Sequence, residues 1–250
     1  MIALVVPCFN EATRFNKAYW TEIVESIPDA LFIFVNDGST DETSKVISSL
    51  KNEQCFFLNS PTNLGKGEAI RLGLNFALQK FKPHSLGFID SDGAFGPVDI
   101  RNLIAAANDK FSPPSKITCL ISSRVALSGR KIERSKFRHY MGRIIVSYVC
   151  LGWNHPPYDT QSGFKIFKSE PDFVEAITTK FATRWFFDIE ILLRISRDRS
   201  DKVWEVPLES WCEIGNSSIN LREFGRVARE IRTIRKLVNS EKKQVWYGSN

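Results

Sequence analysis

The feature that most constrains the fold of this chain is an alternation of short apolar segments with amphipathic segments over roughly its first ninety residues. Runs of four to six mostly apolar residues, typical of buried strands, lie at 2–7, 31–35, 55–58 and 86–89. Segments with helical spacing of apolar residues separate them, at 17–26, about 41–50 and 67–81. Buried strands that alternate with helices indicate an α/β fold, with a mostly parallel sheet covered on both faces.

The second half is less regular but shows no boundary between domains. Further strands are expected at 116–122, 163–167, 203–206 and 209–212, and further helices at 132–151, 172–178, 188–196 and 221–238. The 250 residues suffice for one large domain, and no internal repeat or low-complexity linker divides them. We therefore predict a single domain over residues 1–239 and a polar, flexible tail over 240–250.

Acidic residues follow three of the four strands predicted for the first half. Glu11 follows the first strand, Asp37 the second, and Asp90 and Asp92 the fourth. The carboxyl ends of parallel strands share one edge of the sheet, which is where open α/β sheets bind their ligands. The sequence therefore predicts four carboxylates along that edge.

The Asp90-Ser-Asp92 sequence is a candidate metal site. Carboxylate oxygens suit Mg²⁺ or Mn²⁺, and either ion can neutralise a substrate diphosphate. An isolated Asp-x-Asp pattern is about as often a solvated turn as it is a metal site. Its position directly after a buried strand favours the metal site.

Glycines flank Lys66 in the segment Asn63-Leu-Gly-Lys-Gly67, which precedes a predicted helix. Free backbone N–H groups and a lysine at a helix N-terminus suit a phosphate or a carboxylate. The spacing is not that of a Walker A loop. A simple turn before a capped helix explains the segment equally well.

Nine short motifs, in order along residues 2–238, resemble those of family 2 glycosyltransferases, which have the GT-A fold. The general family motifs are Pro7-Cys-Phe-Asn-Glu11, Asn36-Asp-Gly-Ser-Thr-Asp41, Asn63-Leu-Gly-Lys-Gly67, Asp90-Ser-Asp92 and Ser122-Ser-Arg124. The motifs similar to the polyprenyl-phosphate sugar synthases, the branch that includes dolichyl-phosphate mannose synthase-like enzymes, are Asp159-Thr-Gln-Ser-Gly-Phe-Lys165, Trp185-Phe-Phe-Asp-Ile-Glu190, Glu205-Val-Pro207 with Trp211, and Asn216-Ser-Ser-Ile219.

The resemblance implies a role for each candidate site residue. Glu11 and Asp37 would contact the nucleoside, while Pro7 shapes the first loop. Asp90 would lie near the ribose and the metal, and Asp92 would ligate the metal beside the β-phosphate. The residues implied in phosphate binding are Arg124, Arg138 and Arg222, and those implied in the sugar and acceptor region are Gln161, Asp188 and Glu190.

Two departures from the family pattern bear on the donor. Ala94 stands where relatives with a third metal ligand often carry Gln, so water or substrate must complete the coordination shell. Asn36 stands where many relatives have Asp, which leaves the choice of nucleobase open.

Asp188 bears on the acceptor. An acceptor phosphate is already an anion, whereas an acceptor hydroxyl needs a general base, for which Asp188 is the obvious candidate. Exposed carboxylates in the first turn of a helix, favoured by the helix dipole, are an equally good interpretation of Asp188 and Glu190.

The predicted helix at 132–151 carries an apolar stripe bordered by basic residues. The stripe consists of Phe137, Tyr140, Met141, Ile144, Ile145, Tyr148 and Val149, and the basic residues are Arg130, Lys131, Arg134, Lys136, Arg138 and Arg143. In a globular domain such a stripe usually packs on the sheet. A basic amphipathic helix with aromatic residues can instead lie in a membrane interface. The helix at 221–238 also has an apolar side and a basic side, and the basic side could either face solvent or contact anionic lipid headgroups.

We therefore predict an inverting, Mg²⁺- or Mn²⁺-dependent hexosyltransferase that uses a nucleotide-diphosphate sugar of the GDP-mannose or UDP-glucose type and a polyprenyl-phosphate acceptor. No run of about 18 apolar residues predicts a membrane span, so we expect a cytoplasmic, peripheral protein, with a membrane-embedded partner subunit possible. One alternative keeps the donor but transfers sugar to a hydroxyl. The other is a noncatalytic nucleotide- or nucleic-acid-binding module, which the net charge of +6 permits. Nucleic acid is not expected as a partner, because the basic residues alternate with core stripes rather than with exposed aromatic residues.

Overall fold

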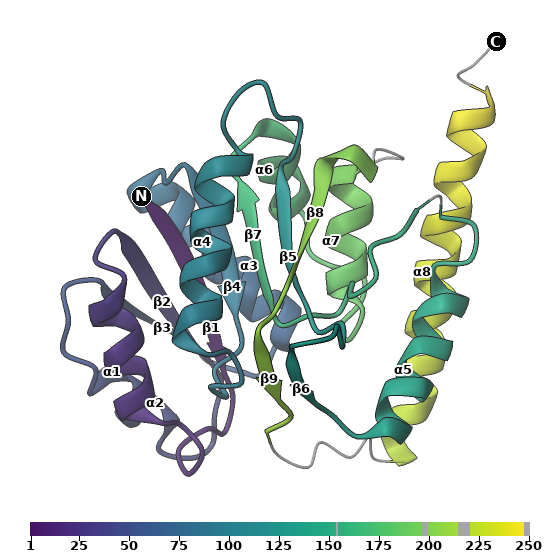
Figure 1. Cartoon of the computed structure of the whole chain (residues 1–250). Coiled ribbons are helices and arrows are strands. Elements are labelled where there is room, and N and C mark those ends of the chain that lie inside the picture. Colours follow the sequence, from purple (N-terminus) through teal and green to yellow (C-terminus); the bar gives the residue numbers. More distant parts are fainter. Residues whose placement is uncertain (154, 197–199, 215–220, 248–250) are drawn as a thin grey trace.

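The predicted alternation forms a seven-stranded sheet with helices on both faces (Figure 1). This computed structural model describes residues 1–153, 155–196, 200–214 and 221–247. The strand order is β3-β2-β1-β4-β7-β5-β8, and only β7 runs antiparallel to its neighbours within this described sheet. The strands are β1 (Ile2–Cys8), β2 (Ala30–Asp37), β3 (Cys55–Ser60), β4 (Ser85–Ile89), β5 (Cys119–Ser123), β7 (Phe164–Lys168) and β8 (Val203–Pro207).

The helices cover the two faces of this sheet and one of its sides. They are α1 (Lys17–Ser26), α2 (Thr43–Ser48), α3 (Lys66–Phe81), α4 (Pro97–Lys110), α5 (Lys136–Val149), α6 (Pro171–Thr178), α7 (Phe187–Ser196) and α8 (Leu221–Tyr247). A short 3-10 helix, η1 (Ser200–Lys202), precedes β8. A second, two-stranded parallel sheet joins β6 (Lys131–Glu133) to β9 (Ser210–Cys212).

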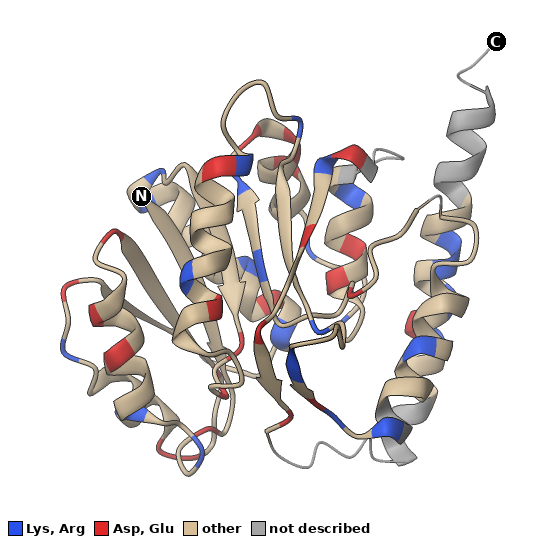
Figure 2. Ribbon diagram, viewed as in Figure 1, with Lys and Arg blue, Asp and Glu red and all other residues tan. Residues whose placement is uncertain are grey.

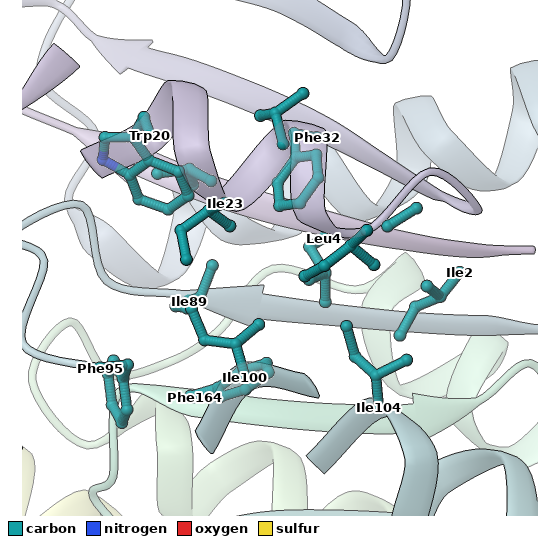
Figure 3. Close-up of a cluster of buried hydrophobic side chains, with 14 of the residues drawn as sticks. Ile2, Leu4, Trp20, Ile23, Phe32, Ile89, Phe95, Ile100, Ile104 and Phe164 are labelled. Carbon is teal, nitrogen blue, oxygen red and sulfur yellow. The ribbon is translucent and has the colours of Figure 1, made fainter. Parts of the chain in front are cut away.

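Each sheet face has its own apolar core, because alternate residues of a strand point to opposite sides. On one face, Leu4 packs with Trp20 of α1 and Ile100 of α4 (Figure 3). On the other face, the neighbouring residue Val5 packs with Leu74 of α3 and residues of α6 and α7. The central strands are therefore apolar on both sides, as the sequence indicated.

Helices α5 and α8 lie beside each other at the β8 side of the molecule, and both carry Lys and Arg residues (Figures 1 and 2). Val149 at the end of α5 packs with Ile234 and Val238 of α8 in a third apolar cluster. By contrast, Tyr140 and Ile144 are 65% and 62% exposed. The more usual arrangement, in which the whole stripe packs on the sheet, is therefore wrong for α5.

Three segments differ from the sequence prediction. Helix α4 was not predicted, although Pro97 suits its first turn and Ile100, Leu103, Ile104 and Ala107 have helical spacing. Residues 131–133 form β6 rather than helix, because they pair with β9. Helix α8 continues to Tyr247 rather than ending at residue 238, whereas the flexibility expected for 240–250 stays a prediction.

A buried carboxylate fastens α8 to the loop before α7. Glu230 is buried and its Oε2 accepts a 2.7 Å hydrogen bond from the backbone N–H of Trp185. We expect Glu230→Ala to lower the free energy of unfolding by about 1–3 kcal/mol, because the hydrogen bond between a charged carboxylate and the Trp185 N–H is lost. Urea unfolding followed by tryptophan fluorescence measures this. Glu175→Ala, on the exposed side of α6, is the control, and equal stability of the two variants would contradict the assignment.

Candidate active site

The predicted carboxylates gather at one edge of the main sheet. Strands β1, β2 and β4 are parallel and in register, so the loops that follow them leave from the same edge. Glu11, Asp90 and Asp92 lie within electrostatic range of one another. Helix α1 holds the loop after β4, because Trp20 Nε1 donates to the carbonyl of Ser91 at 3.1 Å.

This acidic cluster carries more negative charge than its surroundings balance. Burial raises the pKa of Asp92, and the charge of Asp90 raises it further, despite the backbone N–H of Ala94 that donates to Oδ1 at 3.0 Å. Burial also raises the pKa of Glu11, although its ion pair with Arg14 opposes the shift. Oε2 of Glu11 is buried without a hydrogen-bond partner among the described residues. These features suit a bound cation.

The donor set fits a divalent ion only if substrate or water contributes ligands. Among the described residues, no three His, Cys, Asp or Glu side chains are grouped to hold a metal. Asp90 and Asp92 therefore offer two carboxylates, and position 94, an alanine, adds none. This is the coordination that Mg²⁺ usually has beside a substrate phosphate, with few protein ligands.

Asp90 is fixed by its neighbours on two sides. Its backbone N–H donates to the carbonyl of Gly163 at 3.0 Å, and a Cβ at position 163 would lie 2.2 Å from Asp90 Oδ2. Only glycine at 163 leaves room for this carboxylate. On the other side, Lys66 Nζ lies 2.5 Å from Asp90 Oδ1.

Burial lowers the pKa of Lys66, but the carboxylates of Asp90 and Asp188 outweigh it, and the net shift is upward. Lys66 therefore stays charged. Gly65 precedes Lys66 and caps the N-terminus of α3 with a φ of 97°, a conformation that favours glycine.

Asp37 holds the glycine-rich loop before α3. Its two carboxylate oxygens accept hydrogen bonds from the backbone N–H groups of Leu64 (2.8 Å) and Gly65 (2.7 Å), and the residue is 2% exposed. Asn36 is similarly engaged: Nδ2 donates to Asn59, and Oδ1 accepts from the N–H of Ser39. Both ends of the Asn36 side-chain amide are therefore used in hydrogen bonds within the protein.

Arg124 is locked to a carboxylate that the sequence analysis left without a role. Its Nε and Nη2 donate to Asp159 Oδ2 and Oδ1 at 2.8 and 2.7 Å, and Nη2 also donates to the carbonyl of Gln161 at 3.1 Å. The guanidinium lies over the ring of Trp211, 5.2 Å from its centroid. Nη1 takes part in none of these bonds. A phosphate role for Arg124 must therefore use the part of the guanidinium that Asp159 does not hold.

Asp188 and Glu190 are both buried, so the interpretation of exposed first-turn carboxylates is wrong. Asp188 accepts a hydrogen bond from Lys165, which is fully buried. Burial raises the pKa of Asp188 even though Lys165 and Lys66 oppose it.

Glu190 faces structural partners rather than open space. It accepts hydrogen bonds from the N–H groups of Ala182 (2.9 Å) and Thr183 (3.0 Å), and from Arg194 (2.7 Å). It thereby fixes the loop before α7. None of the hydrogen bonds described for Glu190 joins it to Glu11, Asp90 or Asp92.

The remaining predicted site residues divide into two groups. Pro7 lies in β1 opposite Val35 of β2. Arg138 and Arg222 lie in α5 and α8, but their side chains are outside the described residues, and the predicted motif at 216–219 is outside them entirely.

Sequence reasoning missed Lys165, Asp159 and Arg184. Lys165 had a detectable signal: it stands between two apolar residues within a short strand, and lysine is almost never buried unless paired. Asp159 and Arg184 stand in loops, where no periodicity marks a partner. Arg184 bonds to Asn63 Oδ1 in the loop before α3.

The Arg124–Asp159 pair predicts a pH-dependent stability. Burial raises the pKa of Asp159, but Arg124 lowers it more, and the net shift is downward. The pair therefore stabilises the fold above the unfolded-state pKa of about 3.9, and the effect is lost as the pH falls through the lower folded value. We expect Asp159→Ala to cost about 3 kcal/mol in urea unfolding at pH 7 and much less at pH 3. A cost that stays constant or grows toward pH 3 would contradict this.

Known proteins resemble the chain in sequence over most of its length. The family model of glycosyl transferase family 2 matches residues 3–113. A dolichyl-phosphate beta-glucosyltransferase of Trichomonas vaginalis is 30% identical over 242 residues, which cover 91% of this chain and 68% of that protein. The dolichyl-phosphate beta-glucosyltransferase of Homo sapiens is 29% identical, over 87% of this chain and 69% of its own length.

Solved structures share the fold. Glucosyl-3-phosphoglycerate synthase from Mycobacterium tuberculosis in complex with UDP superposes with a TM-score of 0.64 at 19% identity, over 96% of this chain and 80% of that one. Its complex with Mg²⁺ and UDP gives a TM-score of 0.65 at 17% identity, over 94% and 77%. The predicted GT-A fold is thereby confirmed. By its sequence relatives, the chain belongs to glycosyl transferase family 2, in the branch of the dolichyl-phosphate sugar synthases.

Proposed function

We propose that this protein transfers a hexose, with inversion, from a nucleotide-diphosphate sugar to a polyprenyl phosphate. The observation that carries the proposal is the underneutralised acidic cluster of Glu11, Asp90 and Asp92 at the ligand-binding edge of the sheet. The names of the sequence relatives favour glucose as the sugar and dolichyl phosphate as the acceptor. A UDP-sugar is accordingly the first donor to test.

The donor diphosphate would lie between the acidic cluster and the loop before α3. Asp92 and Asp90 would hold Mg²⁺ or Mn²⁺, and Glu11 would face the nucleoside. When bound, such an ion supplies positive charge that stabilises the departing diphosphate. Lys66 adds a positive charge at the start of α3. The free backbone N–H groups of the first turn of this helix also favour an anion.

Asp188 favours a phosphate acceptor over a hydroxyl acceptor. A hydroxyl would need a carboxylate within hydrogen-bond reach to take its proton. Asp188 is the obvious candidate for that base, but it is buried and already accepts a hydrogen bond from Lys165. An acceptor phosphate attacks as an anion and does not require this carboxylate as a base.

Cations near the start of α5 suit an anionic acceptor. Arg134 lies close to Arg124: burial lowers the pKa of Arg134, and the positive charge of Arg124 lowers it further. Arg143 donates to the carbonyl of Tyr158 at 2.5 Å and lies over its ring. A bound phosphate would offset the repulsion between Arg124 and Arg134.

The exposed side of α5 offers a route for a lipid acceptor. Tyr140, Met141, Ile144 and Tyr148 are exposed there, and Lys136 and Arg143 accompany them on the helix. Exposed aromatic and aliphatic residues with adjacent basic groups suit the interface of an anionic membrane. No helix among the described residues has the length and apolar character to cross a bilayer. We therefore propose that the protein docks on the membrane from the side, through α5.

Nucleotide release tests the reaction. The purified protein is given polyprenyl phosphate in detergent, UDP-glucose or GDP-mannose, and Mn²⁺, Mg²⁺ or EDTA. We expect release that requires both metal and lipid phosphate, and a loss of at least about a hundredfold in Asp92→Asn, because Asp92 would ligate the ion. Asp109→Asn, an exposed change on α4, is the matched control and should behave as wild type.

Other outcomes separate the alternatives. Release without lipid phosphate would support only donor hydrolysis and would reopen the hydroxyl acceptor. No release with either donor would contradict the proposal and favour a noncatalytic module.

Vesicle co-sedimentation tests the docking surface. We expect the double variant Tyr140→Glu with Ile144→Glu to lose at least about tenfold in affinity for vesicles of phosphatidylcholine and phosphatidylglycerol, because apolar contact area is lost and negative charge is added. Trp204→Glu, which changes an exposed aromatic residue on β8, is the control. Failure of the wild-type protein to bind vesicles would contradict docking through α5 and direct attention to a membrane-embedded partner subunit.

A further inference from the structure

Lys66 occupies the position of a counter-cation at the candidate metal site. Its Nζ lies 2.5 Å from Asp90 Oδ1. Lys66 also lies within electrostatic range of Asp92 and Asp188. The lysine therefore neutralises part of the charge that a divalent ion would otherwise neutralise.

The other cations nearby have partners of their own. Arg14 pairs with Glu11 at 2.9 Å, Arg124 with Asp159 at 2.7 Å, and Lys165 is buried against Asp188. Lys66 differs from them because its partner is Asp90, one of the two proposed metal ligands, and because its ammonium ends a flexible four-carbon stem. It is the cation that a metal ion at Asp90 would have to displace.

A divalent ion and the Lys66 ammonium compete for the same carboxylate. If the ion binds Asp90 while the ammonium stays, two positive groups face each other across one oxygen, and repulsion weakens ion binding. A diphosphate removes this conflict, because its anionic oxygens give the ammonium a new partner at the N-terminus of α3.

We propose that Lys66 makes tight binding of the divalent ion depend on the nucleotide diphosphate. The inference rests on the proposed function, because it takes Asp90 and Asp92 as the metal ligands. Coupling between two ligands is reciprocal, so the ion and the nucleotide would each raise the affinity of the other by the same factor. Lys66 would then keep the free enzyme from holding a metal ion without its donor.

Mn²⁺ titration followed by the paramagnetic resonance of free Mn²⁺ tests this without any transfer reaction. We expect Lys66→Met to bind Mn²⁺ alone about tenfold more tightly than wild type, and UDP to enhance Mn²⁺ binding less in the variant than in wild type. Lys51→Met, an exposed lysine in the loop before β3, is the control and should match wild type.

Two results would overturn the inference. The variant Asp92→Asn separates failure of the Lys66 role from failure of the metal site itself. Mn²⁺ binding that disappears in Asp92→Asn but is equal or weaker in Lys66→Met would refute the role of Lys66 and leave the metal site intact. Mn²⁺ binding that is absent from both wild type and Lys66→Met, with UDP present, would refute the metal site and this inference with it.

Discussion

The common register of three parallel strands is the constraint on which the rest of the molecule depends. Strands β1, β2 and β4 are buried on both faces, so their backbone and side-chain positions leave no freedom to slip. Their loops must therefore leave from one edge. Carboxylates therefore lie close together at that edge. Their mutual repulsion is unfavourable unless a bound ligand balances the negative charge.

Buried charged side chains hold the segments around this edge in place. Lys165 holds Asp188, Arg124 holds Asp159, and Asp37 binds the loop that carries Lys66. Because a buried charge is tolerated only when it is paired, each of these contacts also fixes a loop. Asp92 is the exception, because no ion pair is described for it while Arg14 pairs with Glu11 and Lys66 with Asp90. An unbalanced carboxylate of this kind is expected where a ligand completes the site.

The sequence was most informative where local pattern and tertiary structure agree. The apolar runs at 2–7 and 31–35 predicted β1 and β2 because both of their faces are buried. The loops of Glu11, Asp37, Asp90 and Asp92 follow directly from those strands. Motif order then identified the family, which composition alone could not do.

Long-range pairing explains what the sequence did not predict. Residues 131–133 are a strand only because β9 lies beside them, and Lys165 is buried only because Asp188 meets it across two elements. Periodicity predicted a helix at α5 but not which side of it would stay exposed, since that depends on where α8 packs. The role of Arg124 likewise depends on Asp159, thirty-five residues away.

The central claim is that the acidic cluster binds a divalent ion together with a nucleotide diphosphate. The most direct test is the position of Mn²⁺ in crystals grown with UDP, located by its anomalous scattering. The account predicts a peak about 2 Å from a carboxylate oxygen of Asp92, between the cluster and the diphosphate. Bound UDP with no peak at Asp92, or with a peak elsewhere, would contradict it.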